Sequence, residues 1–162
     1  MDQDEYQQFL SKFERKKTTD DCYTPPDVYQ AVLDYVSTFF SLKGRPIVRP
    51  FFPGGDYRLL SYSDNSVVID NPPFSIISQI ARFYIAKAIP FFLFAPHLTL
   101  FGSDLKCTHV VAGADIVYEN GAKVKTSFLT NMMGNVKVIA APCLYNAVKR
   151  INNSNKKLLW EK

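Results

Sequence analysis

The sequence predicts an α/β protein whose sheet is parallel in its first half and has an antiparallel hairpin late in the chain. Two apolar runs, residues 66–70 and 90–96, are typical of strands covered on both faces. Between them, residues 74–89 have helical periodicity, and the right-handed crossover rule makes two strands joined in this way parallel. Glu119-Asn120-Gly121 is a hairpin turn signal.

The elements follow one another with few interruptions. Residues 3–16 place apolar side chains at helical spacing, and a polar segment to residue 21 reads as a linker. A second helix begins at the prolines of "YTPPD", has Val28, Val32, Tyr35, Val36 and Phe39 on its core face, and is stopped by Gly44. Residues 47–51 predict a short strand that ends in a glycine turn. After the hairpin, residues 136–142 predict a strand and residues 143–151 a helix.

Length and composition fit one soluble domain. A chain of 162 residues with 47% hydrophobic and 21% charged residues can bury a single core. We expect residues 1–150 to form this domain and residues 151–162 to form a basic tail. The N-terminus lacks the basic start and apolar stretch of a signal peptide, and prolines and charges interrupt the most apolar window. We therefore expect a cytoplasmic protein without a membrane span.

The cysteines and histidines do not predict a metal site. Cys22, Cys107 and Cys143 are far apart, and no C-x-x-C pair is present. The chain has only two histidines, His97 and His109, and their spacing suggests neither a zinc centre nor a catalytic triad. The expected metal content is therefore none.

The most informative segment is "VVIDNPPF", where a strand ends in an acid, an amide, two prolines and a ring. Ligands of open α/β sheets bind beyond the carboxyl ends of the strands, and "FFPGGD" ends at such a position as well. The two segments could therefore face one pocket. Taken alone, Pro-Pro favours a rigid turn between strand and helix.

The complete string resembles the D/N-P-P-Y/F signature of amino-group methyltransferases that use S-adenosylmethionine. "DNPPFSI", "FFLFAPHLTLF", "YENGAKVKTSFLTN" and "AAPCLYNAV" together resemble a family of phage and prophage DNA N6-adenine methyltransferases, in collinear order over roughly residues 20–150. The resemblance implies a Rossmann-like methyltransferase sheet. It also implies methyl transfer to the N6 of a flipped adenine in double-stranded DNA, in a bacterial or phage-infected cell.

The chemistry of this reaction suits the residue types. The N6 amine of adenine is a poor nucleophile because its lone pair is delocalised into the ring. The side-chain oxygen of Asn71 and the carbonyl of Pro72 can accept its two N–H bonds and direct the lone pair to the methyl donor. Pro73 stiffens the loop, and Phe74 offers a stacking face for the base. These four residues are the expected catalytic set.

The resemblance also implies the cofactor ligands, and the basic residues of the second half of the chain suggest the DNA contacts. The sequence departs from the usual methyltransferase pattern because two strand–helix units, one with an acid for the ribose hydroxyls, are missing after the glycine loop, and Asp64 is the only nearby acid that could replace it. The expected ligands of S-adenosylmethionine are Tyr23, Thr24, Pro53, Gly54, Gly55, Asp56 and Asp70. The expected DNA contacts are Lys123, Lys125, Lys149 and Arg150.

Other functions fit the same features. Asn-Pro-Pro-aromatic loops also serve the methylation of RNA bases and protein glutamines, and a DNA-binding or decoy module could keep the fold without the cofactor. His97 reads as a capping or surface histidine. The hydroxyls of Thr126, Ser127 and Thr130 read as strand positions that face solvent or satisfy neighbours, beside lysines that could touch phosphate.

Overall fold

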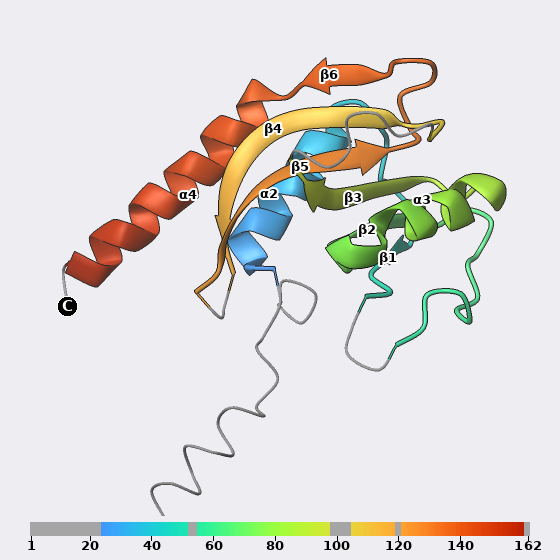
Figure 1. The fold of residues 1–162 in the computed structure, drawn as a ribbon, viewed down its shortest axis with the longest axis horizontal. Coiled ribbons are helices and arrows are strands. Elements are labelled where there is room, and N and C mark those ends of the chain that lie inside the picture. The colour runs from blue at the N-terminus through green and yellow to red at the C-terminus, as the bar shows by residue number, and fades with distance from the viewer. Residues whose placement is uncertain (1–23, 52–54, 98–104, 119–120, 161–162) are drawn as a thin grey trace, which may run out of the picture.

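The computed structural model of the chain describes residues 24–51, 55–97, 105–118 and 121–160 (Figure 1). The helix predicted for residues 3–16 lies outside these ranges. Within them, no helix is both long enough and apolar enough to cross a membrane.

A mixed sheet forms the centre of the fold, with strand order β1-β2-β3-β5-β4-β6. β1, β2 and β3 are parallel, β5 lies antiparallel between β3 and β4, and β6 is parallel to β4. The predicted α/β class, with a parallel first half and a late hairpin, is confirmed. The strands are β1 (Ile47–Val48), β2 (Val67–Asp70), β3 (Phe91–Pro96), β4 (Thr108–Val117), β5 (Lys123–Thr130) and β6 (Val138–Ala140).

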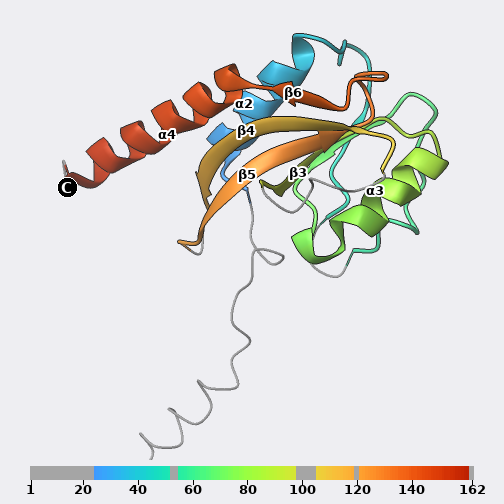
Figure 2. The ribbon, with the colours of Figure 1, turned by 45° about the horizontal axis from the view of Figure 1, so that its top comes forward.

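Helices cover both faces of the sheet, which explains why β2 and β3 are almost continuously apolar. α2 (Pro26–Ser37) and α4 (Pro142–Trp160) pack on one face, and α3 (Ile77–Ala86) packs on the other after a short turn of 3₁₀ helix, η2 (Phe74–Ile76) (Figure 2). α3 connects β2 to β3, and these strands are parallel as the crossover rule requires.

The core has one apolar cluster on each side of the sheet. Val28, Val32 and Val36 of α2 recur every four residues and pack with Phe92 and Phe128, whose rings stack with centroids 5.2 Å apart. On the other face, Tyr84 of α3 is fully buried, and its hydroxyl lies 2.8 Å from that of Tyr62.

β4 and β5 form the predicted hairpin, and of its predicted turn residues Glu119 and Asn120 lie outside the described residues. The backbone N–H of Tyr118 donates to the carbonyl of Ala122 at 2.9 Å, and Gly121 has a φ of +83°. Such a φ favours glycine because a Cβ would be strained there. A register shift between Val110 and Ala114 interrupts the β4 ladder, and Gly113, at a φ of +60°, lies within this β-bulge.

The ends of three elements differ from the sequence-based expectation. β1 stops at Val48, short of residue 51, because Pro50 lacks an N–H and the N–H of Phe51 bonds to Asp70. α2 ends at Ser37, so Phe39 lies outside the helix and is partly exposed. α4 continues to Trp160 through the predicted tail, since residues 151–160 contain neither glycine nor proline.

The hydroxyl residues of β5 satisfy neighbouring groups, which is one of the two alternatives that the sequence left open. Thr126, Ser127 and Thr130 do not face solvent: all three are buried, and each makes a hydrogen bond. The hydroxyl of Thr130, for example, donates to the carbonyl of Phe91 at 2.6 Å. β5 lies inside the sheet between β3 and β4, and the two apolar clusters cover its faces along this segment.

Candidate functional site

The ends of several strands and the start of α2 meet at one edge of the sheet. β2 ends at Asp70, and β3 continues three residues beyond its pairing with Asp70 and ends at Pro96. β5 is antiparallel to β3, so its amino end, Lys123, lies at the same edge. The first turn of α2 lies there too, since Pro25 and Val28 share a cavity with the end of β4. This carboxyl edge is where ligands of α/β sheets bind.

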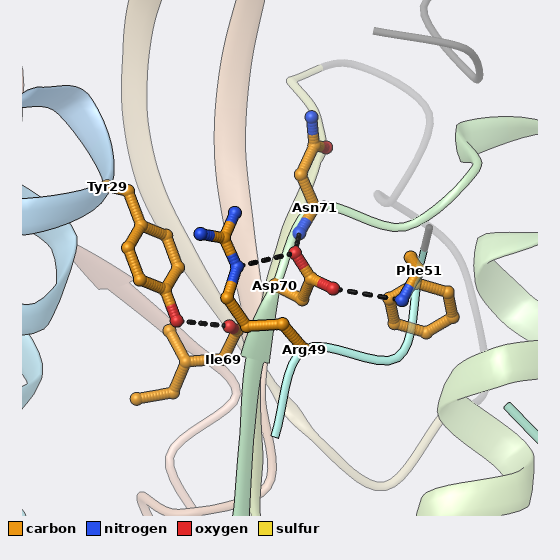
Figure 3. Close-up of polar contacts among 6 residues, drawn as sticks. All are labelled: Tyr29, Arg49, Phe51, Ile69, Asp70 and Asn71. Carbon is orange, nitrogen blue, oxygen red and sulfur yellow. Dashed lines mark hydrogen bonds and ion pairs between the residues drawn. The ribbon is translucent and has the colours of Figure 1, made fainter. Parts of the chain in front are cut away.

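Asp70 is the central polar residue of the edge (Figure 3). Its side chain is 5% exposed. Oδ2 accepts the backbone N–H of Phe51 at 3.0 Å, and Oδ1 accepts the N–H of Asn71 at 2.9 Å and Nε of Arg49 at 3.3 Å. Burial raises the pKa of Asp70, although these hydrogen bonds and the arginine charge act in the opposite direction. The carboxylate therefore joins the segment after β1 to the loop after β2.

The four predicted catalytic residues form one rigid connection from β2 to α3. Pro72 is buried, and Pro73, with φ −56° and ψ 118°, precedes the 3₁₀ turn that begins at Phe74. The ring of Phe74 is half-buried and packs at the border of the α2-side core. The sequence therefore places an amide, two prolines and a ring together, as expected.

Two of the predicted site residues carry buried oxygens that have no hydrogen-bond partner among the described residues. They are Oδ1 of Asn71 and Oγ1 of Thr24. Thr24 immediately precedes Pro25 at the start of α2, and Figure 3 shows the carboxamide of Asn71 pointing away from Asp70. An unsatisfied buried acceptor costs about 1–3 kcal/mol, so such groups are candidates for ligand contacts.

Sequence reasoning missed Arg49 and Tyr29. The guanidinium of Arg49 lies over the ring of Tyr29, with Cζ 3.7 Å from the centroid. The hydroxyl of Tyr29 donates to the carbonyl of Ile69 at 2.7 Å, and burial raises its pKa to about 12. The available signal was an arginine directly after a strand at the carboxyl edge.

The predicted cofactor loop is only partly described. Tyr23, Pro53 and Gly54 lie outside the described residues, and Gly55 is exposed. The carboxylate of Asp56 pairs with Arg58, Oδ2 to Nη2 at 3.0 Å, and hydrogen bonds from Arg58 lower the pKa of Asp56. Asp56 is therefore already paired with a cation of its own loop.

Asp64, the candidate for the ribose hydroxyls, is not brought to this edge. It is exposed in the loop before β2 and lines a hollow with Ser66, Lys87 and Pro90, at the amino ends of β2 and β3. β1 is the terminal strand of the described sheet on that side. Among the described residues, no further strand lies beyond β1 to carry an acid for the ribose hydroxyls.

The predicted DNA contacts lie in three places. Lys123 and Lys149, with Lys156, line a cavity of about 470 Å³ between the start of α2, the end of β4 and α4. Nζ of Lys123 lies 3.7 Å from the carboxylate of Asp115, which also lines the cavity. Arg150 lines a shallower hollow between α2 and α4, and Lys125 is exposed on β5.

His97 is more specifically held than a surface histidine. Its Nδ1 lies 2.8 Å from Oγ of Ser127, which also accepts the N–H groups of Ala112 and Gly113 in the bulge. A Cβ on Gly113 would lie 3.1 Å from the imidazole Cε1. The glycine and the serine together fix the ring at the end of β3.

No three potential metal-ligating side chains gather anywhere in the described ranges. A scan against models of known protein families, a search of curated proteins and a search of solved structures each returned no match.

Proposed function

We propose that the chain transfers a methyl group from S-adenosylmethionine to the N6 of a flipped adenine in DNA. The observation that carries the proposal is the buried Oδ1 of Asn71, which has no hydrogen-bond partner within the described ranges and lies in an Asn-Pro-Pro-Phe loop at the carboxyl edge of parallel strands. An acceptor in this position is completed by a ligand N–H.

The loop supplies two acceptors for one planar amine. Oδ1 of Asn71 and the carbonyl of Pro72 take the two N–H bonds of N6, which directs its lone pair toward the methyl donor. The bond from the N–H of Asn71 to Asp70 holds the backbone at the start of the loop, and the fixed φ of each proline limits its movement. Positioning, rather than a strong base, is the main contribution of these residues.

The base enters from the open side of the edge. Phe74 is half-buried at the end of the loop, and we assign its ring as the stacking face for the base, a contact that contributes about 1–3 kcal/mol per base. Unstacking the adenine from the duplex costs a few kcal/mol, which stacking on a protein ring helps to offset.

Residues of this edge also suit the cofactor. Oγ1 of Thr24 is buried and has no hydrogen-bond partner in the part of the chain that the structure describes, and the N–H of Phe51 donates to Asp70. When bound, S-adenosylmethionine supplies a methyl group already activated on its sulfonium. The abbreviated sheet leaves the ribose hydroxyls without the acid that the family pattern expects.

The lysine-lined cavity suits the phosphates of the same DNA. Lys123 lies at the amino end of β5, on the edge that carries Asn71, and Lys149 and Lys156 face the cavity from α4. Three lysines against Asp115 leave an excess of positive charge, which favours contact with phosphates.

Calorimetric titration with S-adenosylmethionine, followed by transfer of a labelled methyl group, tests this function. Unmethylated DNA, RNA and protein are compared as acceptors. We expect cofactor binding and labelling of adenine N6 in DNA. A folded chain that binds DNA but not the cofactor would instead support the non-catalytic module, and labelling of RNA or of protein glutamine would replace the substrate.

A further inference from the structure

Arg49 is fixed in position by two side chains from different elements. Its Nε bonds to Oδ1 of Asp70 at the end of β2, and its guanidinium lies on the ring of Tyr29 in α2. Both supports are themselves held: Asp70 is nearly fully buried and accepts two backbone N–H groups, and Tyr29 donates to the carbonyl of Ile69. An arginine held in this way loses little conformational entropy when it binds a ligand.

The binding edge of this guanidinium is left open. Arginine has five N–H donors, and only the Nε bond is used among the described residues. Figure 3 shows the two terminal nitrogens directed away from Asp70, and the side chain is 46% exposed. An ion pair that served only to neutralise Asp70 would present the two-nitrogen fork to the carboxylate. Here the fork remains available to something else.

The ligand chemistry that fits such a fork is a planar or tetrahedral oxyanion. Carboxylates and phosphates accept two parallel N–H bonds from arginine, and these charged bonds are among the stronger ones in proteins. Two sources of this chemistry exist under the proposed function: the carboxylate of the methionine end of S-adenosylmethionine, and a phosphate of DNA.

The position of Arg49 favours the cofactor. Oδ1 of Asp70 accepts both Nε of Arg49 and the N–H of Asn71, so one oxygen links the arginine to the start of the catalytic loop. In S-adenosylmethionine three carbon atoms separate the sulfonium from the carboxylate carbon, so a donor placed at Asn71 carries its carboxylate only a short way from the reacting centre. Arg49 also directly precedes the segment that leads to the glycine loop.

We propose that Arg49 binds the carboxylate of the methyl donor through its two terminal nitrogens. This proposal rests on the proposed function. It adds a residue that neither the D/N-P-P-Y/F signature nor the glycine loop contains, and it assigns the buried Asp70 to positioning Arg49 and not to direct contact with the cofactor.

Calorimetry on the full chain with three probes tests the proposal: S-adenosylmethionine, its decarboxylated form, and a short adenine-containing DNA duplex. The variants are Arg49→Gln and Arg49→Lys. The lysine keeps a positive charge beside Asp70 but lacks the two-nitrogen fork. Arg45→Gln is the matched control, since Arg45 also lies over a ring, that of Phe40 at 4.7 Å, but precedes β1 at the opposite edge.

We expect Arg49→Gln to weaken S-adenosylmethionine about 10- to 100-fold and to leave the decarboxylated form within about twofold. Arg49→Lys should lie between, and Arg45→Gln should match the wild type. Equal weakening of both cofactors would overturn the contact with the carboxylate.

The DNA arm separates the two sources of oxyanion. If Arg49→Gln leaves both cofactors unchanged but lowers DNA affinity and its salt dependence, the ligand is a phosphate and the assignment to the cofactor is wrong. If the wild type binds DNA but no cofactor, the proposed function fails, and an effect of Arg49→Gln on DNA alone still supports the oxyanion site. No effect on any probe would overturn the site itself.

Discussion

The backbone N–H of Phe51 donates to Oδ2 of Asp70 at 3.0 Å, and this bond ties the chain that leaves β1 to the carboxyl end of β2. Replacing Asp70 with asparagine leaves a single oxygen for three donors and adds an NH₂ group facing them. We expect Asp70→Asn to lower the free energy of unfolding by about 1–3 kcal/mol, as measured by urea denaturation. An unchanged unfolding midpoint would contradict this role.

The carboxylate of Asp70 also makes the free energy of unfolding depend on pH. Burial raises the pKa of Asp70 above its ordinary value of 3.8, so the folded chain keeps this proton at pH values where the unfolded chain has released it. The resulting stabilisation is complete below pH 3.8 and is lost as the pH rises through the folded-state pKa. The difference in unfolding free energy between wild type and Asp70→Asn should therefore fall as the pH rises above 3.8. A difference that rises with pH would show that the hydrogen bonds, and not burial, dominate.

Gly113 and Gly134 have the same φ of +60° but different surroundings. Alanine at either position is strained by about 1–2 kcal/mol, but only at Gly113 would its Cβ meet another side chain, the ring of His97 at 3.1 Å. We expect Gly113→Ala to cost about 1 kcal/mol more than Gly134→Ala in thermal or urea unfolding. Adding His97→Ala to Gly113→Ala should remove this excess, and an excess that persists would place the strain in the backbone alone.

Tyr29 supports Arg49 with its ring and Ile69 with its hydroxyl. Tyr29→Phe keeps the ring and should cost about 1 kcal/mol of stability through the lost hydrogen bond, with cofactor affinity within about twofold of wild type. Tyr29→Leu removes the ring and should also weaken S-adenosylmethionine severalfold in calorimetry. Equal cofactor affinity in the two variants would show that the stacked ring does not position Arg49.

The thiols of Cys107 and Cys143 should react at different rates. Burial raises the pKa of Cys107 to about 11, whereas Cys143 is exposed near the start of α4. Because the thiolate is the reactive form, iodoacetamide at pH 8 should label Cys143 and leave Cys107 unmodified until urea is added, as read from peptide masses. Comparable labelling of both in the folded chain would contradict the packing around Cys107.

Much of the fold could be predicted because local pattern and tertiary environment agree. β2 is a continuous apolar run, and the valines of α2 recur every four residues. Both elements were therefore predicted to within a few residues of their observed bounds. The extension of α4 could not be predicted from apolar periodicity, since residues 152–160 are largely polar or exposed. Leu158, Leu159 and Trp160 face solvent there.

The sequence predicted the residues of the candidate site that are adjacent in the chain. Asn71 to Phe74 form a single loop, so the sequence showed them together. Arg49 and Tyr29 come from separate elements and meet only through the packing of α2 on the sheet, which no local pattern records. The sequence left open whether Ser127 faces solvent or satisfies a neighbour, because a hydroxyl that holds His97 looks like any other polar strand residue.

Transfer of a labelled methyl group to adenine-containing duplex DNA by Asn71→Ala tests the central claim most directly. Asn65→Ala is the matched control, because Asn65 lies at the opposite end of β2, where its Nδ2 donates to the carbonyl of Gly44 at 3.3 Å. We predict that Asn71→Ala lowers the rate of transfer about 100- to 1000-fold, with S-adenosylmethionine affinity within about twofold of wild type and Asn65→Ala fully active. Transfer by Asn71→Ala at the wild-type rate would contradict the assignment of Asn71 as the acceptor of the adenine N–H.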